Sequence, residues 1–138
     1  MTTQAAIEKL KEATYSLPQN IDGLITRHHF ADGLYCRELF RPADRLIVGK
    51  KHKKAHIYIV VQGEVTITWA GKEPERVVGP KVFACPAGTQ RAVYAHTDAL
   101  CLTVHPTEAT EVADAEDDLI EHDPNSQFIT GNQLKALP

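Results

Sequence analysis

The hydrophobic and polar positions of this chain follow two periods, one after the other. Over residues 3–17 the apolar residues recur at helical spacing, as Ile7, Leu10, Ala13 and Leu17. This spacing predicts one amphipathic helix, which a threonine caps and Pro18 ends. From residue 24 to residue 105 the chain instead shows short β-like runs, at 24–30, 34–40, 45–48, 56–61, 65–69, 76–78, 82–84, 91–95 and 100–104. Many short strands without intervening helices predict a β-sandwich or β-barrel.

After the last predicted strand the composition changes sharply. Residues 106–123 carry eight acids and no Lys or Arg, whereas residues 24–105 carry twelve Lys or Arg against seven acids. We therefore expect an N-terminal helix at 1–20, a basic barrel at 21–106 and an acidic, partly helical extension at 107–138. The extension is either a solvated helix with a loose tail, or a segment that packs on a neighbouring barrel or screens the basic pocket.

Length and composition exclude several classes of protein. A chain of 138 residues with a net charge of −3 fits one globular domain and gives no global reason to bind nucleic acid or an anionic membrane. The start of the chain does not read as a signal peptide, and no run of about 20 apolar residues could span a bilayer. Cys36, Cys85 and Cys101 read as reduced core residues. We expect a cytoplasmic protein with neither a nucleic-acid nor a membrane partner.

Two ordered motifs carry a resemblance to a known fold. The stretch 49–63 begins Gly-Lys-Lys-His and ends at Gly63, and residues 86–91 read Pro-Ala-Gly-Thr-Gln-Arg. These resemble the two cupin motifs, His-x-His followed by Glu and Gly, and Pro-x-Gly-x-x-His. Lys50, His52, His56 and Arg91 then stand at the four positions where a metal-binding cupin has three His and one Glu. The resemblance implies a mainly β, single-domain antiparallel barrel of the jelly-roll type.

The residue patterns of the motifs also resemble a narrower group, the small cupin-like proteins that tailed bacteriophages encode. The shared texts are Gly-Lys-x-His-Lys-x-x-His, Pro-x-Gly-Thr-x-Arg-x-x-Tyr-Ala and Thr-Val-His-x-Thr-Glu, followed by an acidic helix. If the resemblance holds, the protein works in the host cytoplasm. The group supplies no secure activity to carry over.

The substitutions at the four matched positions disfavour the usual metal. A unit positive charge about 5 Å from a divalent ion costs roughly 6–7 kcal/mol at an effective dielectric constant of about 20. Lys50 and Arg91 would impose this cost, and a guanidinium does not become a ligand. We therefore expect either no cofactor or a divalent transition metal held by His52, His56 and His105, with His96 as another candidate third ligand.

Without a metal, the same residues form a receptor for a small anion. Arg91 offers two parallel hydrogen bonds to phosphate or carboxylate, Lys50 adds a compact charge, and protonated imidazoles at His52 and His56 would donate as well. Neighbouring strands bring further candidate ligand-binding residues, namely Tyr94, Thr103 and His105.

Three functions follow from these residues. One is a cupin-type protein that binds a phosphate- or carboxylate-bearing molecule such as a nucleotide. Another is an enzyme (isomerase, lyase or phosphoester-cleaving) that uses a metal or the imidazoles of His52, His56 and His105 as acid and base. The third is a non-catalytic structural or interaction module. Cupin barrels commonly pair through their sheet edges, which implies a homo-oligomer and most simply a dimer.

Overall fold

The computed structural model describes residues 1–15, 21–123, 128–129 and 133–134. The predicted N-terminal helix is confirmed as α1 (Gln4–Tyr15). Its first turn is capped by the hydroxyl of Thr3, which accepts a hydrogen bond from the backbone N–H of Ala6 at 3.1 Å. Pro18, the predicted stop, lies outside the described residues. Neither this helix nor any other described one is long and apolar enough to cross a membrane.

All nine predicted strands are present, with ends that differ from the prediction by one residue at most sites. They are β1 (Ile25–Ala31), β2 (Leu34–Arg41), β3 (Leu46–Val48), β4 (His56–Gln62), β5 (Glu64–Trp69), β6 (Glu75–Val78), β7 (Lys81–Cys85), β8 (Arg91–Ala95) and β9 (Ala99–Pro106). A short hairpin of β10 (Phe128–Ile129) and β11 (Gln133–Leu134) follows near the C-terminus.

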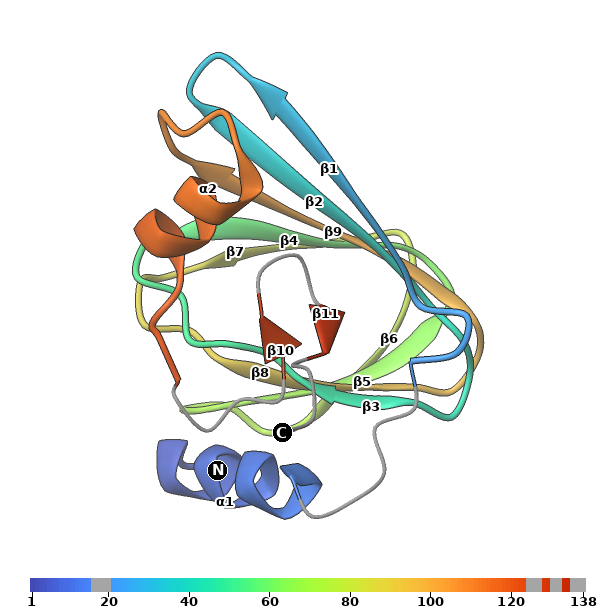
Figure 1. Cartoon of the computed structure of the whole chain (residues 1–138). Coiled ribbons are helices and arrows are strands. Elements are labelled where there is room, and N and C mark those ends of the chain that lie inside the picture. The colour runs from blue at the N-terminus through green and yellow to red at the C-terminus, as the bar shows by residue number, and fades with distance from the viewer. Residues whose placement is uncertain (16–20, 124–127, 130–132, 135–138) are drawn as a thin grey trace.

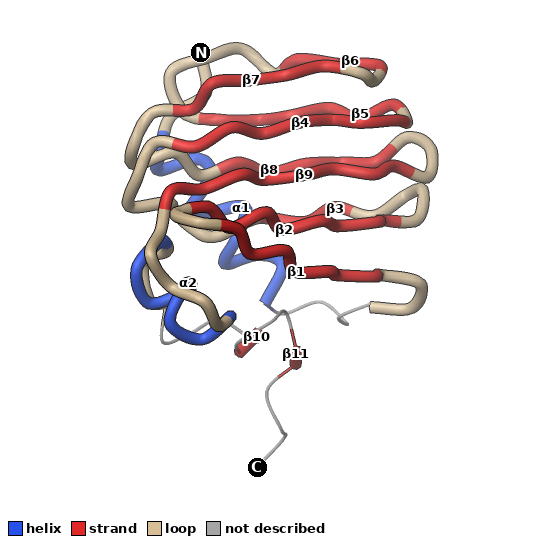
Figure 2. The backbone as a smooth tube through the Cα atoms, turned by 90° about the horizontal axis from the view of Figure 1, so that it is seen from above, coloured by secondary structure: helices blue, strands red, loops and turns tan. Residues whose placement is uncertain are grey.

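The nine strands form two antiparallel sheets that face each other (Figure 1). One sheet has the order β1-β2-β9-β4-β7 and the other the order β3-β8-β5-β6. Figure 2 shows the strands of the two sheets running alongside one another, from β6 and β7 at one end of the barrel to β1 at the other. The described residues are therefore mainly β in a jelly-roll-like barrel, as the motifs implied, with two helices, as the spacing and charge pattern predicted.

The apolar core fills only one end of this barrel. Its buried side chains come largely from β4 to β7 and from the facing parts of β8 and β9, including Val60, Val65, Ile67 and Trp69. A separate small cluster joins Tyr35 of β2 to Ala115 and Leu119 in the acidic segment. The end between β1, β2 and β3 therefore has a different lining.

The acidic segment folds back onto its own barrel. Part of it forms α2 (Val112–Leu119), as predicted. The Lys54 ammonium lies 2.8 Å from the Asp118 carboxylate, and the backbone N–H of Lys53 donates to the carbonyl of Leu119 at 2.7 Å. Sequence analysis left open whether this segment is solvated, packs on a neighbouring barrel or screens the basic pocket. The geometry supports the last of these, with the segment against the basic end of its own barrel.

The basic stretch before β4 is a loop rather than a continuous strand. Alternation would place residues 50, 52, 54 and 56 on one face if a regular strand ran through them without a bulge, and it does not. Regular strand begins only at His56, while His52 forms an isolated bridge with Ile120. The alternation fails because this loop pairs with the acidic segment, which turns Lys54 outward to Asp118.

Candidate functional site

A cavity of about 810 Å³ opens at the end of the barrel that the apolar core leaves free. It lies between β1, β2 and β9 on one side and β3 and β8 on the other, and α2 contributes to its rim. Its lining combines apolar positions with polar ones, which include Arg37, Arg41, Lys50, His52, Tyr58, Arg91, Thr103 and His105. Carboxylates also line it, namely Glu8, Asp44, Glu116, Glu121 and Asp123. A cavity of this size accommodates a small organic molecule.

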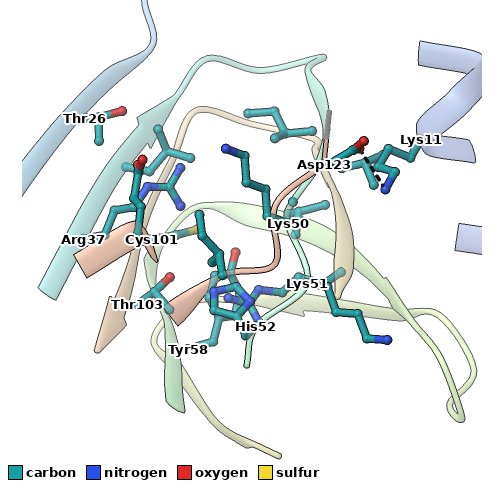
Figure 3. A pocket seen from close by; sticks show the side chains of 18 of the residues that line it. Lys11, Thr26, Arg37, Lys50, Lys51, His52, Tyr58, Cys101, Thr103 and Asp123 are labelled. Carbon is teal, nitrogen blue, oxygen red and sulfur yellow. Dashed lines mark ion pairs between the residues drawn. The ribbon is translucent and has the colours of Figure 1, made fainter. Parts of the chain in front are cut away.

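Strand register brings several of these side chains into one row. Arg37 of β2 stands opposite Thr103 of β9, and Thr103 stands opposite Tyr58 of β4. Because side chains alternate along a strand, Arg37 and Arg41 share the inward face of β2 with the buried Tyr35 and Leu39. Figure 3 shows Arg37 and Lys50 extending toward the same space beside His52, Tyr58 and Thr103.

The sequence analysis missed Arg37, Arg41 and Tyr58 as site residues. A signal was present, since β2 places two arginines in phase with Tyr35 and Leu39 on what must be the buried face of an alternating strand. Neither cupin motif includes β2, so the motifs gave no indication of these two arginines.

Arg91 is the most constrained of the cations. It is only 6% exposed, its Nη1 lies 2.9 Å from Nε2 of His56, and its guanidinium carbon lies 4.0 Å from the centre of the Tyr58 ring. A guanidinium always carries its proton, so Arg91 donates and the imidazole accepts. His56 itself does not line the cavity and holds Arg91 from behind.

The three arginines repel one another, although the charge of Glu116 offsets part of this repulsion at Arg37. Burial lowers the pKa of Arg37 and of Arg91, and the nearby charge of Arg41 lowers each pKa further. None of the three guanidinium groups forms an ion pair with a carboxylate in the part of the chain that the structure describes. Among the same residues, the buried Nε of Arg41 and hydroxyl of Tyr58 have no hydrogen-bond partner.

Three imidazoles stack beside this cluster. The ring of His52 lies 4.0 Å from that of His56 and 5.2 Å from that of His105, centre to centre. The Nδ1 atom of each ring is directed at a backbone carbonyl, those of Thr89, Lys54 and Tyr35. A carbonyl cannot donate, so each Nδ1 carries the proton and each Nε2 is left as an acceptor.

These histidines are neutral near pH 7. Burial and the charge of Arg91 lower the pKa of His52 to about 2, and burial is the main cause that lowers the pKa of His105 to about 4. The pKa of His56 is lowered by burial as well. Without a ligand, the positive charge of the site therefore comes from arginine and lysine, and donation by protonated imidazoles to a bound anion stays a prediction.

The imidazole cluster does not suit a divalent cation. His105 does join His52 and His56, whereas His96 lies elsewhere with its Nε2 2.6 Å from the Thr66 hydroxyl. The three stacked rings are within 27° of parallel, so their in-plane lone pairs do not converge on one point, and the lone pair of His56 already accepts from Arg91. Among the described residues no group of three His, Cys, Asp or Glu side chains could hold a metal ion.

Tyr94 departs from its expected position. It does not line the cavity, because it lies on β8 out of phase with the inward-facing Arg91 and Val93. Its hydroxyl donates to the Asp44 carboxylate at 2.9 Å instead. The other expected contacts, Lys50, His52, Thr103 and His105, do line the cavity.

Comparison with solved structures places this architecture among the cupins. Similar structures include a cupin superfamily protein from Desulfitobacterium hafniense DCB-2, with a TM-score of 0.55 and 14% identity over 65% of this chain and 83% of that one. The DMSP lyase DddQ from Ruegeria pomeroyi DSS-3 gives a TM-score of 0.56 and 18% identity over 80% and 68% of the two chains.

A third similar structure is salicylate 1,2-dioxygenase from Pseudoaminobacter salicylatoxidans. Its TM-score is 0.57 and its identity 14%, over 81% of this chain and 32% of the dioxygenase. At these identities the likeness establishes the cupin fold alone. No protein-family model matches the sequence, and no curated protein matches it either.

Proposed function

We propose that this protein binds a small organic anion, carrying a phosphate or carboxylate group, in the barrel cavity. The observation that carries the proposal is the set of three arginines, Arg37, Arg41 and Arg91, which line one cavity and have no carboxylate ion-pair partner among the described residues. Arg41 and Arg91 are buried and Arg37 is half-buried. Gathering such cations without an ion-paired carboxylate is costly, and an anion shared between them offsets that cost.

The rest of the lining suits an organic molecule better than a bare ion. A single phosphate would fill only a small part of about 810 Å³. Leu39, Ile47 and Val93 line the cavity beside the cations with apolar surface, and Tyr58 and Thr103 offer hydroxyls. Salicylate 1,2-dioxygenase, which is described with gentisate, illustrates that an aromatic carboxylate can occupy this fold.

The histidines fit binding better than acid–base catalysis. A general acid or base works best with a pKa near the operating pH, whereas the pKa values of His52 and His105 are about 2 and about 4. His56 serves to orient Arg91. We assign Arg37, Arg41, Arg91 and Lys50 to the anionic group and give the imidazoles a supporting role.

Two expectations stay predictions from the sequence, namely the phage origin and the cytoplasmic location. If both hold, the proposed ligand is a metabolite or signalling nucleotide of the host cell, and the protein sequesters it.

Calorimetric titration against nucleotides, sugar phosphates and small carboxylates tests the proposal. We expect at least one member to bind, and Arg91→Ala to weaken that binding by about 2–5 kcal/mol because a buried two-point contact is lost. Arg37→Gln should also weaken binding without disturbing the His56 hydrogen bond. Arg27→Gln is the matched control, since Arg27 lies on β1 of the same sheet but pairs with Glu38 on the exterior. If no member of the panel binds, or if Arg37→Gln and Arg27→Gln bind alike, the proposal is wrong.

A further inference from the structure

The three arginines of the cavity are not equivalent, because two of them lie deeper than the third. Arg41 and Arg91 are 4% and 6% exposed, whereas Arg37 is half-buried. The Nη1 atom of Arg41 donates to the carbonyl of Val93 at 3.4 Å, and Arg91 lies over the ring of Tyr58. Val93 and Tyr58 both belong to the apolar core. We call Arg41 and Arg91, which lie where the cavity meets this core, the inner arginine pair.

The carboxylates that line the cavity do not pair with these two arginines. Asp123 and Glu8 both pair with Lys11 of α1, at 3.1 Å and 2.9 Å. Figure 3 shows Asp123 and Lys11 across the cavity from Tyr58. Asp44 is exposed to solvent.

The carboxylates of the acidic segment act on the outer part of the cavity. Glu121 is exposed, and Glu116 of α2 is half-buried. Burial lowers the pKa of Arg37, and the charge of Glu116 offsets part of this effect. Over the residues that the structure describes, no carboxylate forms an ion pair with either member of the inner arginine pair. The inner end of the cavity therefore lacks negative charge.

The inner end also lacks hydrogen-bond acceptors. The Nε2 atom of His56 accepts from Arg91 at 2.9 Å, and the carbonyl of Val93 accepts from Arg41. The buried Nε of Arg41 and hydroxyl of Tyr58 find no partner in the described part of the chain, and both groups can donate. Buried donors without an acceptor cost free energy. An anion rich in oxygen atoms would supply both the charge and the acceptors.

We infer that the ligand is a phosphate monoester, whose doubly charged phosphate group binds at the inner arginine pair. The inference rests on the proposed function and narrows it from small organic anions to one chemical class. A phosphate monoester carries about 1.5 to 2 negative charges at pH 7 and three strong acceptor oxygens. Two charges match the two guanidinium groups of Arg41 and Arg91, whereas a carboxylate would leave one buried cation uncompensated. Guanidinium groups also suit phosphate oxygens in geometry, because they donate two parallel hydrogen bonds.

The position of the inner arginine pair also sets the direction of the ligand. The apolar core closes the cavity behind Arg41 and Arg91, so the organic part of the monoester extends toward the open end. Thr103 and Lys50 line the cavity as well and offer a hydroxyl and an ammonium group. The volume of about 810 Å³ accommodates an organic part of the size of a sugar or a nucleoside.

Three small probes separate charge from shape, namely methyl phosphate, methyl sulfate and acetate. Methyl sulfate has the shape of methyl phosphate but only one negative charge, and acetate is the smallest matched carboxylate. NMR titration of the backbone amides of the full chain, at constant ionic strength and pH 7.5, gives the affinity for each probe. We expect methyl phosphate to bind at least about tenfold more tightly than either of the other two, because only its charge matches the pair.

Variants then place the phosphate group. Arg41→Gln should abolish the preference for methyl phosphate over methyl sulfate, because it leaves a single buried cation at the inner end. Arg27→Gln is the control and should keep the preference, since Arg27 pairs with Glu38 on the exterior at 2.8 Å. Arg91→Lys should keep the preference but weaken the binding of methyl phosphate, because the charge remains and the two-point contact is lost. The comparison of probes on the wild type needs no variant, so it stands if Arg41→Gln does not fold.

Three results would overturn the inference. One is methyl sulfate or acetate binding as tightly as methyl phosphate, which would leave the binding of a small anion intact but not its class. Another is an Arg41→Gln variant that prefers methyl phosphate as strongly as the wild type. The third is no binding of methyl phosphate up to about 50 mM. The proposed function fails separately, if no member of the larger calorimetric panel binds.

Discussion

At the scale of single residues, this barrel carries cations where a stable core would carry apolar side chains. Arg37 and Arg41 alternate with Tyr35 and Leu39 on the inward face of β2, and Arg91 lies between His56 and Tyr58. Buried charges are retained at a cost in stability, which makes them informative about function. Replacing one of these arginines with an apolar residue should therefore lower the affinity for the anion and raise the free energy of unfolding.

Arg37→Met should show this opposition. Removing one of three mutually repelling cations relieves the ligand-free protein, and we expect its free energy of unfolding to rise by about 1 kcal/mol. Affinity for the anion should fall at the same time. Urea denaturation without ligand measures the first effect. A loss of stability of more than about 1 kcal/mol would mean that Arg37 forms a stabilising contact in the ligand-free protein, which contradicts its assignment to ligand binding alone.

The neutral histidines predict a loss of stability in mild acid. A histidine whose pKa is about 4 when folded and about 6.5 when unfolded binds its proton preferentially in the unfolded state between these values. Stability is therefore complete above pH 6.5 and falls as the pH drops. At pH 5 the difference is about 2 kcal/mol for His105, and the pKa of His52, about 2, predicts a similar loss.

Denaturation at pH 7 and pH 5 tests this dependence. His105→Asn should reduce the difference between the two values, since it removes a group that charges only on unfolding. His122→Ala is the control, because His122 is exposed beyond α2 and should leave the difference unchanged. Equal stability of the wild type at both pH values would refute the neutral, buried state of the three imidazoles.

At the scale of elements, patterns local in sequence were sufficient for the helices and strands but not for the loop that bounds the site. All nine strands of the barrel follow from alternation and turn residues. The path of residues 50–55 depends on contacts far along the chain, since the backbone N–H of Lys53 donates to the carbonyl of Leu119 and the carbonyl of Lys51 accepts from the N–H of Glu121. The inward arginines of β2 were missed because a charged residue is ordinarily assigned to the outer face.

The acidic helix should be held by its apolar side and its backbone more than by its charges. Leu119 is 2% exposed against Tyr35, so Leu119→Ala should cost about 2–4 kcal/mol of unfolding free energy. Asp118→Asn should cost less than about 1 kcal/mol, because the pair with Lys54 is largely exposed to solvent. Urea denaturation of the two variants side by side gives the comparison. A larger loss for Asp118→Asn would show that ionic contacts hold α2 in place.

At the scale of the whole molecule, the two ends of the barrel differ in the side chains that fill them. The end near β6 and β7 holds the apolar core, and this core allows the end near β1 to β3 to keep a polar cavity. The acidic segment then folds against the basic loop at that open end, which accounts for the opposite charges of barrel and extension. The cupin motifs predicted the fold, whereas the arginines and the tyrosine that line the cavity became visible only with the side chains of β2 and β4 in place.

A crystal structure of the protein with the tightest ligand from the titration panel tests the central claim most directly. We expect the phosphate or carboxylate of the ligand within hydrogen-bonding distance of at least two of Arg37, Arg41 and Arg91, with its remainder elsewhere in the same cavity. A ligand bound outside the cavity would contradict this account. So would a metal ion coordinated by His52, His56 and His105 with the three guanidinium groups turned away.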